Sequence, residues 1–255
     1  MSHLSNKHGL WILRDAVFLR AEGGTAVHET PAPYRETAGI EDALQATDAL
    51  LAPLSGHSVT VRLGFPWTRH VVVPWHPRLI GEAEWLTWAR AACDEPGAEP
   101  GAGLGDGLDN QHIALTPARH GAPRLAIIGN TPLLTALIAQ CKSHRVRLIA
   151  ATSTFAYALH RYRRELAVSG CAPAVHERGM LTCALRDGPS ITAITTVAAQ
   201  SDLSPQIHAV LRCLALAASA PAPETVALIG GAAEPDDRIR WLGDHLCPAG
   251  EGGSA

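Results

Sequence analysis

Residues 124–162 carry the most regular hydrophobic pattern of the chain and join its two halves. A short apolar run at 125–128 is followed by apolar residues that repeat at helical spacing up to Cys141. Thr131 is expected to cap this helix, and Pro132 to occupy its first position. The pattern therefore predicts a strand followed directly by a helix.

The same stretch then repeats this order. Residues 146–149 form a second apolar run, and the cluster at 152–154 (Thr-Ser-Thr) offers caps for another helix over 155–166. Strand, helix, strand and helix in succession predict that the two strands pair in parallel through a right-handed crossover. The expected fold class is α/β.

Composition excludes several classes of function. The chain has 255 residues and a net charge of −3, and its only lysines are Lys7 and Lys142, so the basic stripe of a nucleic-acid-binding protein is missing. The amino terminus is polar and no apolar run is long enough to cross a bilayer, which predicts a cytoplasmic protein. The six cysteines lie far apart and are expected to be small core residues.

Other elements follow from periodicity and turn residues. Strands are expected at 10–19, 25–30, 59–63, 71–73, 111–116, 179–186, 190–196 and 225–229. Helices are expected at 40–54, 204–218 and 235–246. Between the strands at 179–186 and 190–196, the trio Asp187, Gly188 and Pro189 is typical of a hairpin turn.

Four tryptophans, Trp67, Trp75, Trp85 and Trp88, fall within one short segment. The favoured interpretation is a small satellite core in which Trp85 and Trp88, on a helix, cover a strand. The alternative is a surface that anchors a partner peptide. The acidic, Gly- and Pro-rich segment 94–110 is expected to be a mobile surface loop, since it lacks the ligand spacing of a calcium loop.

The order of expected elements occurs twice, and on this order the chain resembles the two-lobed actin-like (ribonuclease H-like) ATPase fold. It is most similar to the type IV pilus assembly ATPase-like family and to the cytoplasmic part of type II secretion protein L. The resemblance is carried by GNTPLLTALIAQCKSHRVRLIAATSTFAYAL (129–159), by the hairpin GMLTCALRDGPSITAITT (179–196) and by VALIGG (226–231).

The resemblance implies a domain organisation. Residues 1–154 would form the first lobe, with an inserted tryptophan-rich subdomain, and residues 155–247 a second lobe shortened at its carboxyl end. Residues 248–255 would be a disordered tail. A full second lobe would add another strand and helix after Leu246, so the missing strand could be supplied by another chain.

In active members of the fold, two hairpins and a later glycine pair hold the nucleotide and its metal. The positions here that match this pattern are Asp15, Glu177, Gly179, Thr182, Gly230 and Gly231. The first hairpin departs from it, because Trp11 and Leu13 stand where small residues are expected. We therefore expect no catalytic residue, no metal site and no resident cofactor, with binding of ATP and magnesium as the alternative.

The resemblance implies a non-catalytic scaffold or adaptor of a type IV pilus or type II secretion platform, peripheral at the cytoplasmic face of the inner membrane. Its partner would be an inner-membrane platform protein that offers a short cytoplasmic peptide, and Trp67, Trp75 and Trp85 would line the binding groove. A homodimer is left open. The alternative function is a nucleotide-binding ATPase or phosphotransferase of the actin-like and sugar-kinase superfamily, although the P-loop, zinc-ligand and hydrolase-elbow motifs are missing.

Overall fold

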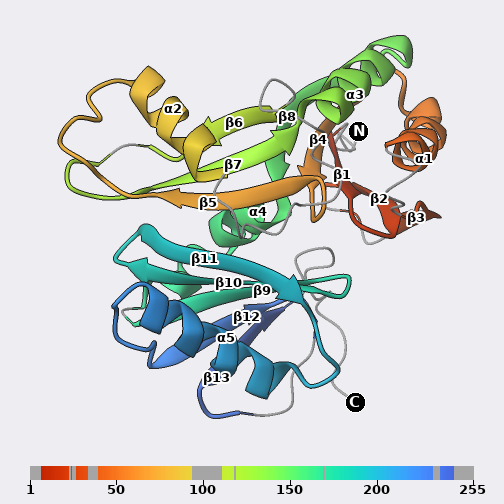
Figure 1. Cartoon of the computed structure of the whole chain (residues 1–255). Coiled ribbons are helices and arrows are strands. Elements are labelled where there is room, and N and C mark those ends of the chain that lie inside the picture. The colour runs from red at the N-terminus through yellow and green to blue at the C-terminus, as the bar shows by residue number, and fades with distance from the viewer. Residues whose placement is uncertain are drawn as a thin grey trace. The chain divides into compact units, whose positions relative to one another are not determined.

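Two five-stranded sheets and one three-stranded sheet form the framework of the chain in the computed structural model (Figure 1). The structure describes residues 7–22, 24, 27–33, 40–93, 111–117, 119–168, 170–231 and 236–243. The loop expected at 94–110 and the tail expected at 248–255 lie outside these residues. Helices pack on mixed sheets, so the predicted α/β class is confirmed.

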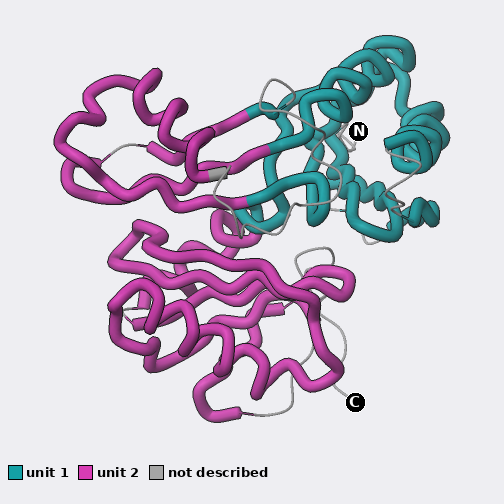
Figure 2. Tube along the Cα trace, viewed as in Figure 1, with its two compact units in different colours: residues 1–69, 101–112, 129–157 teal, residues 70–100, 113–128, 158–255 magenta. Residues whose placement is uncertain are grey.

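The chain divides into two compact units (Figure 2). The first unit comprises Met1–Arg69, Gly101–His112 and Gly129–Tyr157, and the second comprises His70–Pro100, Ile113–Ile128 and Ala158–Ala255. The tryptophan-bearing insertion therefore groups mostly with the second unit. The lobe boundary expected at residue 154 stays a prediction.

The first sheet has the strand order β3-β2-β1-β4-β8. Its strands are β1 (Lys7–Ile12), β2 (Ala16–Ala21), β3 (Val27–Pro31), β4 (Ser58–Leu63) and β8 (Arg147–Ser153). The first three form an antiparallel meander, whereas β4 and β8 extend the sheet in parallel on the other side of β1. Leu10 pairs in register with both Leu19 and Val61, so these side chains share one buried face.

Two helices, α1 (Glu41–Leu51) and α3 (Thr131–Ser143), cover this buried face. α1 contacts β2 and β3, and α3 contacts β8. The helices also contact each other, because the Gln140 side-chain amide donates a hydrogen bond to the Leu44 carbonyl at 2.8 Å. A single 3-10 turn, Ala52–Leu54, ends α1.

α3 is capped by Asn130 rather than by Thr131, so the predicted cap is wrong by one position. Asn130 has an extended backbone, and its side-chain oxygen accepts a hydrogen bond from the Leu133 amide at 2.7 Å. This is the geometry that satisfies one of the unpaired amides of a first helical turn. Pro132 lies in that turn, as predicted.

The three-stranded sheet has the order β5-β7-β6 and is covered by one helix. Its elements are β5 (Thr68–Val73), α2 (Glu82–Cys93), β6 (Gln111–Leu115) and β7 (Arg124–Asn130). The expected parallel pairing of the two strands around α3 is wrong, because β7 belongs to this small sheet and β8 pairs with β4. Chain order alone does not say which strand a crossover returns to.

The second five-stranded sheet has the order β11-β10-β9-β12-β13. Its strands are β9 (Cys171–Glu177), β10 (Met180–Asp187), β11 (Ser190–Ala198), β12 (Thr225–Ile229) and β13 (Ile239–Gly243). The helix α5 (Leu203–Ala217) packs on one face. Before this sheet come α4 (Thr154–Arg161) and a 3-10 turn, Glu165–Ala167.

The two large sheets have the same topology. In each, three antiparallel strands are followed by a helix and then by two strands that continue the sheet in parallel. α5 contacts β10 and β11 as α1 contacts β2 and β3. Among the described residues α3 has no counterpart, because only residues 230–238 join β12 to β13.

Two of the predicted elements are wrong. The strand expected at 10–19 is two strands joined by a tight turn, in which the Leu13 amide donates to the Ala16 carbonyl at 3.0 Å. The turn contains the exposed residues Arg14 and Asp15, but the apolar residues on both sides of this pair concealed it. The helix expected at 235–246 contains β13 instead, because tertiary pairing with β12 outweighs the apolar spacing. The fifth strand of the second sheet therefore comes from this chain and needs no second subunit.

The remaining predicted elements are confirmed to within a few residues, including the hairpin of β10 and β11 and the helix α5. β9 was not among the expected strands. Its sequence, CAPAVHE, contains a proline and little β-branched content, which hides a buried central strand. Pro173 lies inside it, opposite Ala227.

A histidine pair at the start of the first sheet should make its stability depend on pH. His8 Nε2 and His57 Nδ1 share a hydrogen bond at 2.9 Å, and burial, with a smaller effect of His57, lowers the pKa of His8. The folded state thus disfavours protonation, so the stabilisation is complete above the unfolded pKa of about 6.5 and is lost as pH falls below it. Urea unfolding at pH 7.5 and 5.5 should show a smaller pH-dependent loss of stability for His8→Gln than for the wild type. The exposed His28→Gln serves as the control, and an equal effect of both substitutions would contradict this expectation.

Candidate functional site

Four of the six residues expected at a nucleotide site lie together in the second unit. Glu177 and Gly179 follow the carboxyl end of β9, and Gly230 and Gly231 follow the carboxyl end of β12. The two strands are parallel neighbours, with Ile229 opposite Val175, so both ends lie at one edge of the sheet. In open α/β sheets, ligands bind outside the carboxyl ends of the strands.

The other two expected residues lie within a strand and in the other unit. Thr182 lies within β10, and its hydroxyl shares a hydrogen bond with Thr196 on β11 at 2.9 Å. Thr182 pairs in register with Val175, which pairs with Ile229, so Thr182 lies near the sheet edge that carries the glycines. Asp15 is exposed in the turn between β1 and β2, in the first unit.

The turn between β9 and β10 keeps the geometry of a tight hairpin. Arg178 and Gly179 both have positive φ angles, +41° and +78°, between the paired residues Glu177 and Met180. Two consecutive left-handed residues define a type I′ turn, which normally selects asparagine or glycine at its first position. An arginine at this left-handed position is uncommon, whereas Gly179 adopts its positive φ without steric cost.

The glycine pair after β12 is required for packing. Gly230 and Gly231 have φ angles of +75° and +64°, and the Gly230 amide donates to the Gly243 carbonyl at 2.8 Å, which connects β12 to β13. A Cβ atom on Gly231 would lie 2.4 Å from Nδ1 of His176. His176 therefore belongs to this constellation, and its only signal in the sequence is its position next to Glu177.

The first hairpin turn is closed by its own protein contacts. Leu13 is fully buried, its amide donates to Ala16, and its carbonyl accepts a hydrogen bond from the Trp67 indole at 3.1 Å. Trp11 is also buried. Both large side chains of this hairpin are therefore packed within the protein, and the prediction that they stand in place of small residues stays a prediction.

A buried arginine occupies the opposite face of the first sheet. The Arg62 guanidinium lies 4.2 Å from the ring of Trp11 and 3.9 Å from the ring of Tyr157, and burial lowers its pKa. A Cβ atom on Gly9 would lie 2.1 Å from Nη1 of Arg62, so glycine at this position makes room for the guanidinium. The sequence placed Arg62 on the polar face of a strand, but the partner ring of Tyr157 lies far along the chain.

The tryptophans divide between two cores and one exposed surface. Trp67 is fully buried in the core of the first sheet, and Trp85 is buried in the core under α2. Trp75 is half-buried and meets His120 edge to face. Trp88 is 44% exposed. The predicted satellite core is confirmed for Trp85. A role of Trp67 and Trp85 in binding a partner stays a prediction, and because both side chains are buried, it could only be an indirect one.

We define an aromatic patch as Trp75, His76, Ile80 and Trp88, of which Trp75 and His76 are half-buried and the other two exposed. The rings of His76 and Trp88 are stacked with centroids 5.6 Å apart, and Ile80 is 89% exposed. These side chains offer apolar contact area at the surface of this segment. Such residues are typical anchors for a partner.

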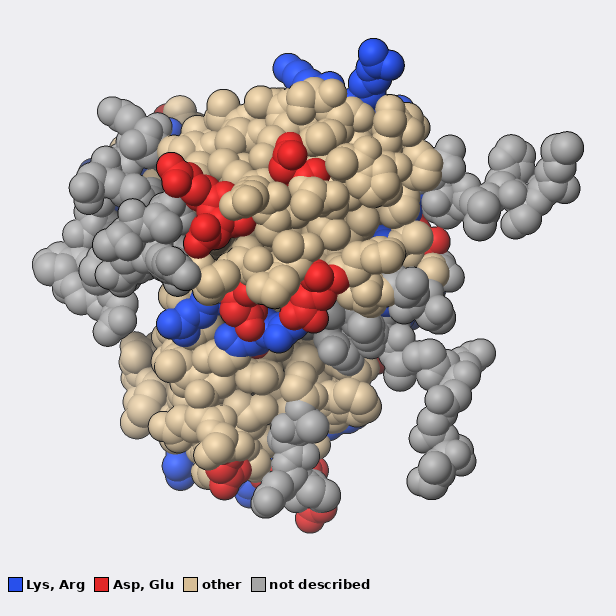
Figure 3. All heavy atoms as spheres, turned by 90° about the vertical axis from the view of Figure 1, so that its right-hand side faces the viewer, with Lys and Arg blue, Asp and Glu red and all other residues tan. Residues whose placement is uncertain are grey.

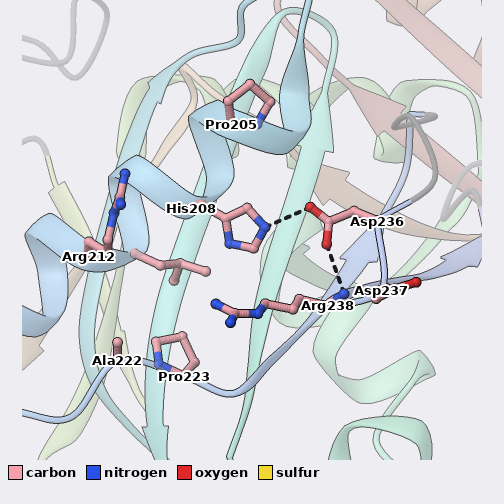
Figure 4. Close-up of a pocket in the computed structure, with 9 residues that line it drawn as sticks. Pro205, His208, Arg212, Ala222, Pro223, Asp236, Asp237 and Arg238 are labelled. Carbon is pink, nitrogen blue, oxygen red and sulfur yellow. Dashed lines mark hydrogen bonds and ion pairs between the residues drawn. The ribbon is translucent and has the colours of Figure 1, made fainter.

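A second cluster surrounds Asp236, between α5 and the chain that leads into β13 (Figure 4). The Asp236 carboxylate accepts hydrogen bonds from Ser204 at 2.6 Å, from His208 at 2.8 Å and from the Arg238 amide at 2.8 Å. The Ser204 hydroxyl, followed by the Arg238 amide and His208, holds the pKa of Asp236 well below its usual range. The cluster borders a hollow of about 710 Å³ that also includes Arg212.

Possible metal ligands and cysteines were located among the described residues. Within the described ranges, no group of three or more His, Cys, Asp or Glu residues could hold a metal ion. Cys141, Cys171 and Cys183 are buried, as predicted, and burial raises the pKa of Cys183 to about 12. Cys213 is exposed on α5, so its predicted core position is wrong.

Charge on the surface is distributed in small groups. On the face shown in Figure 3, charged side chains lie in small groups within a largely uncharged surface. A net charge of −3 is consistent with such a surface. None of the helices in the described part of the chain is long and apolar enough to cross a membrane.

The chain is similar to known proteins in structure but not in sequence. No family model and no curated protein matches the sequence. The structure is similar to a Bacteroides thetaiotaomicron protein of unknown function with an actin-like ATPase fold, with a TM-score of 0.56, 9% identity and coverage of 92% of this chain and 87% of that one.

Two further structures are similar at the same level. One is the cytoplasmic domain of EpsL, an inner-membrane component of the type II secretion system of Vibrio cholerae, with a TM-score of 0.52, 10% identity and coverage of 94% and 91%. The other is the PilM–PilN type IV pilus biogenesis complex, with a TM-score of 0.53, 14% identity and coverage of 89% and 82%. The chain therefore has the actin-like ATPase fold that its sequence predicted.

The close approach at Gly231 predicts a matched pair of substitutions. Gly231→Ala combines a left-handed backbone with a clash against His176, and overpacking of this kind costs about 1–3 kcal/mol beyond the backbone strain. Gly179→Ala has the backbone strain alone, because nothing lies within 4 Å of its Cβ position. Urea unfolding should show the larger loss for Gly231→Ala, and equal losses would show that the approach to His176 does not constrain the fold.

The indole bond of Trp67 predicts a second effect on stability. Trp67→Phe removes the donor to the Leu13 carbonyl and leaves a small cavity, so we expect a loss of about 2–4 kcal/mol in the free energy of unfolding. Trp88→Phe, at an exposed position, should change it by less than about 0.5 kcal/mol. Denaturant unfolding followed by far-UV circular dichroism measures both, and a neutral Trp67→Phe would contradict the role of this bond.

Proposed function

We propose that the chain is a non-catalytic protein-binding scaffold of a type IV pilus or type II secretion platform at the cytoplasmic face of the inner membrane. Support comes from the fold, which resembles those of the EpsL cytoplasmic domain and of PilM, the latter in complex with PilN. Because folds host many functions, the fold alone does not carry the proposal. The observation that carries it is the closed first hairpin.

A nucleotide site of this fold needs backbone amides at its hairpin turns that point toward phosphate oxygens. In the first hairpin, the Leu13 amide already donates within the turn, and the Leu13 carbonyl is held by Trp67. The Leu13 side chain is fully buried, so the turn could open only by exposing it. This arrangement favours a fold retained for binding over one retained for hydrolysis.

For the partner we propose a short cytoplasmic peptide of an inner-membrane platform protein. The aromatic patch is the surface that fits it, since Trp75 and Trp88 present ring surface and Ile80 is 89% exposed. Apolar peptide side chains could pack there, and Trp85, in the core under α2, would support the patch from within, whereas Trp67 belongs to the core of the first sheet. A homodimer remains open.

The alternative function is a nucleotide-binding ATPase or phosphotransferase. One observation favours it: Glu177, Gly179, Gly230 and Gly231 keep their places at the carboxyl edge of the second sheet. The geometry of a turn and a glycine pair is retained there. Their packing roles against His176 and Gly243 account for the same geometry without a ligand.

Titration calorimetry with ATP and magnesium, together with a thermal-shift scan, separates the two functions. The scaffold proposal expects no binding heat and no rise in melting temperature, because a ligand that binds the folded state must stabilise it. Binding of ATP in the micromolar range would instead support the alternative function, a nucleotide-binding ATPase or phosphotransferase. The thermal-shift scan compares the protein at saturating concentrations of ATP and magnesium with the protein without ligand at the same pH.

Capture of peptides tests the proposed partner surface. Immobilised synthetic peptides from the cytoplasmic segments of inner-membrane pilus and secretion proteins should retain the chain, and Trp88→Ala together with Trp75→Ala should reduce retention at least about tenfold. Ile138→Ala is the matched control, because Ile138 is 43% exposed, much as Trp88 is, but lies on α3. Retention that survives the patch substitutions would contradict this surface.

A further inference from the structure

The two large sheets differ in the helices that cover them. In the first half, α3 covers the parallel edge that includes β8 and lies beside α1. In the second half, α5 takes the place of α1, but the described residues between β12 and β13 contain no helix. Within the part of the chain that the structure describes, no counterpart of α3 covers the parallel edge formed by β12 and β13.

The flank of α5 that borders this place can be identified from α1. The residues of α1 that meet α3 are Leu44 and Asp48, whose side chain is 2.6 Å from His144, and each directly follows a buried residue. The buried residues of α5 are Leu203, Ile207, Leu211 and Ala215. Because the two halves have the same topology, the corresponding flank of α5 contains the residues that follow these.

That flank is a straight row of side chains on the helix surface. His208, Arg212 and Leu216 are spaced four residues apart, so they lie one above another on one side of α5. Leu216 is 81% exposed. An exposed leucine at the end of such a row is what a helix presents when its neighbour is missing.

The row borders the hollow of about 710 Å³ beside Asp236 (Figure 4). Leu211 and the rings of Pro205 and Pro223 provide apolar lining. Arg238 extends from the other side toward α5. The hollow is therefore lined by apolar surface with basic groups at its edges.

β13 adds an exposed aromatic ring to the same face. Ile239 pairs in register with Val226, and Trp241 pairs with Leu228. Val226 and Leu228 belong to the core beneath α5, so Trp241 lies on the face that α5 partly covers. Trp241 is nevertheless 52% exposed.

Two guanidinium groups and two carboxylates, those of Asp236 and Asp237, lie around the hollow. Among the residues that the structure describes, the guanidinium groups of Arg212 and Arg238 have no carboxylate partner. The Asp236 carboxylate is already engaged by Ser204 and His208. A group that enters the hollow would find two unpaired positive charges, which favour an acidic occupant.

We propose that this place, the α5 surface defined by His208, Arg212, Leu216, Arg238 and Trp241, binds an amphipathic helix of a partner protein. The partner helix lies beside α5 as α3 lies beside α1. Its apolar residues, at i, i+4 and i+7 spacing, contact Leu216 and Trp241, and its acidic residues pair with the two arginines. The inference rests on the internal repeat, and it concerns a surface other than the aromatic patch.

The probe is a fluorescein-labelled helical peptide of about 16 residues, with leucines on one face and glutamates on both flanks. Fluorescence anisotropy with the full chain should show saturable binding. Arg212→Glu combined with Arg238→Glu should weaken it at least about tenfold, and a peptide with lysine in place of glutamate should recover binding to that variant. Arg90→Glu, an exposed charge reversal on α2, should leave binding unchanged.

The apolar half of the surface has its own matched pair. Leu216→Ser should weaken binding of the peptide, whereas Ile149→Ser, at an exposed position on β8 outside both proposed surfaces, should not. Both positions are exposed, so both variants should fold, and circular dichroism checks this. The proposal is overturned if the wild type shows no saturable binding, if Ile149→Ser weakens binding of the peptide instead, or if binding survives the arginine and leucine substitutions.

Measurements of self-association test the other possible occupant of this surface, a second copy of the chain. Sedimentation velocity over a range of concentrations should show that Leu216→Ser and Trp241→Ala leave the oligomeric state unchanged. Loss of a dimer in these variants would assign the surface to a second copy of the chain and overturn the partner helix. Neither result depends on whether ATP binds or whether pilus peptides are captured, so this inference and the proposed function can fail separately.

Discussion

The parallel pairing of a central strand with the strand that returns from a helix is the constraint on which each half of the molecule depends. β1 pairs with β4, and β9 pairs with β12, so that Leu10 lies opposite Val61 and Ala174 lies opposite Leu228. A parallel pair needs a crossover, and α1 and α5 provide it while closing over the buried face. The same pairing places the glycine turn after β12 beside the end of β9, which is why that edge retains the form of a ligand site.

The sequence predicted the elements with strong periodicity, and it failed where distant residues decide the structure. α3 was correct because its apolar residues repeat over several turns, yet the partner strand of β8 depends on pairing that periodicity does not contain. Leu13 looked like part of a strand, although it lies in a turn whose carbonyl binds Trp67 from far along the chain. The fold class could be predicted from the order of strands and helices, because this order does not change when the end of a single element is predicted wrongly.

The candidate site could be predicted less well than the fold. The glycine pair at 230–231 was identified, but its constraint comes from His176, which no motif marks. Arg62 alternates with buried valine and leucine and so looks like an exposed strand residue, while its burial depends on Tyr157. The two hairpins also differ: the first is closed by buried side chains, whereas the second keeps its turn geometry with an arginine at the left-handed position. This asymmetry is the physical basis for favouring binding over catalysis.

The two halves share a topology, but they differ in the number of described helices that cover their sheets. This difference affects local unfolding. In the first half, two helices shield one face, whereas among the described residues of the second half a single helix does. Both outer strands, β8 and β13, are mostly exposed or half-buried, so the difference lies in the contacts that α3 makes with β8. Local opening costs least free energy where few apolar contacts break, so β13 should exchange its amide hydrogens sooner than β8 does. We therefore expect β13 to detach while the rest of its sheet persists.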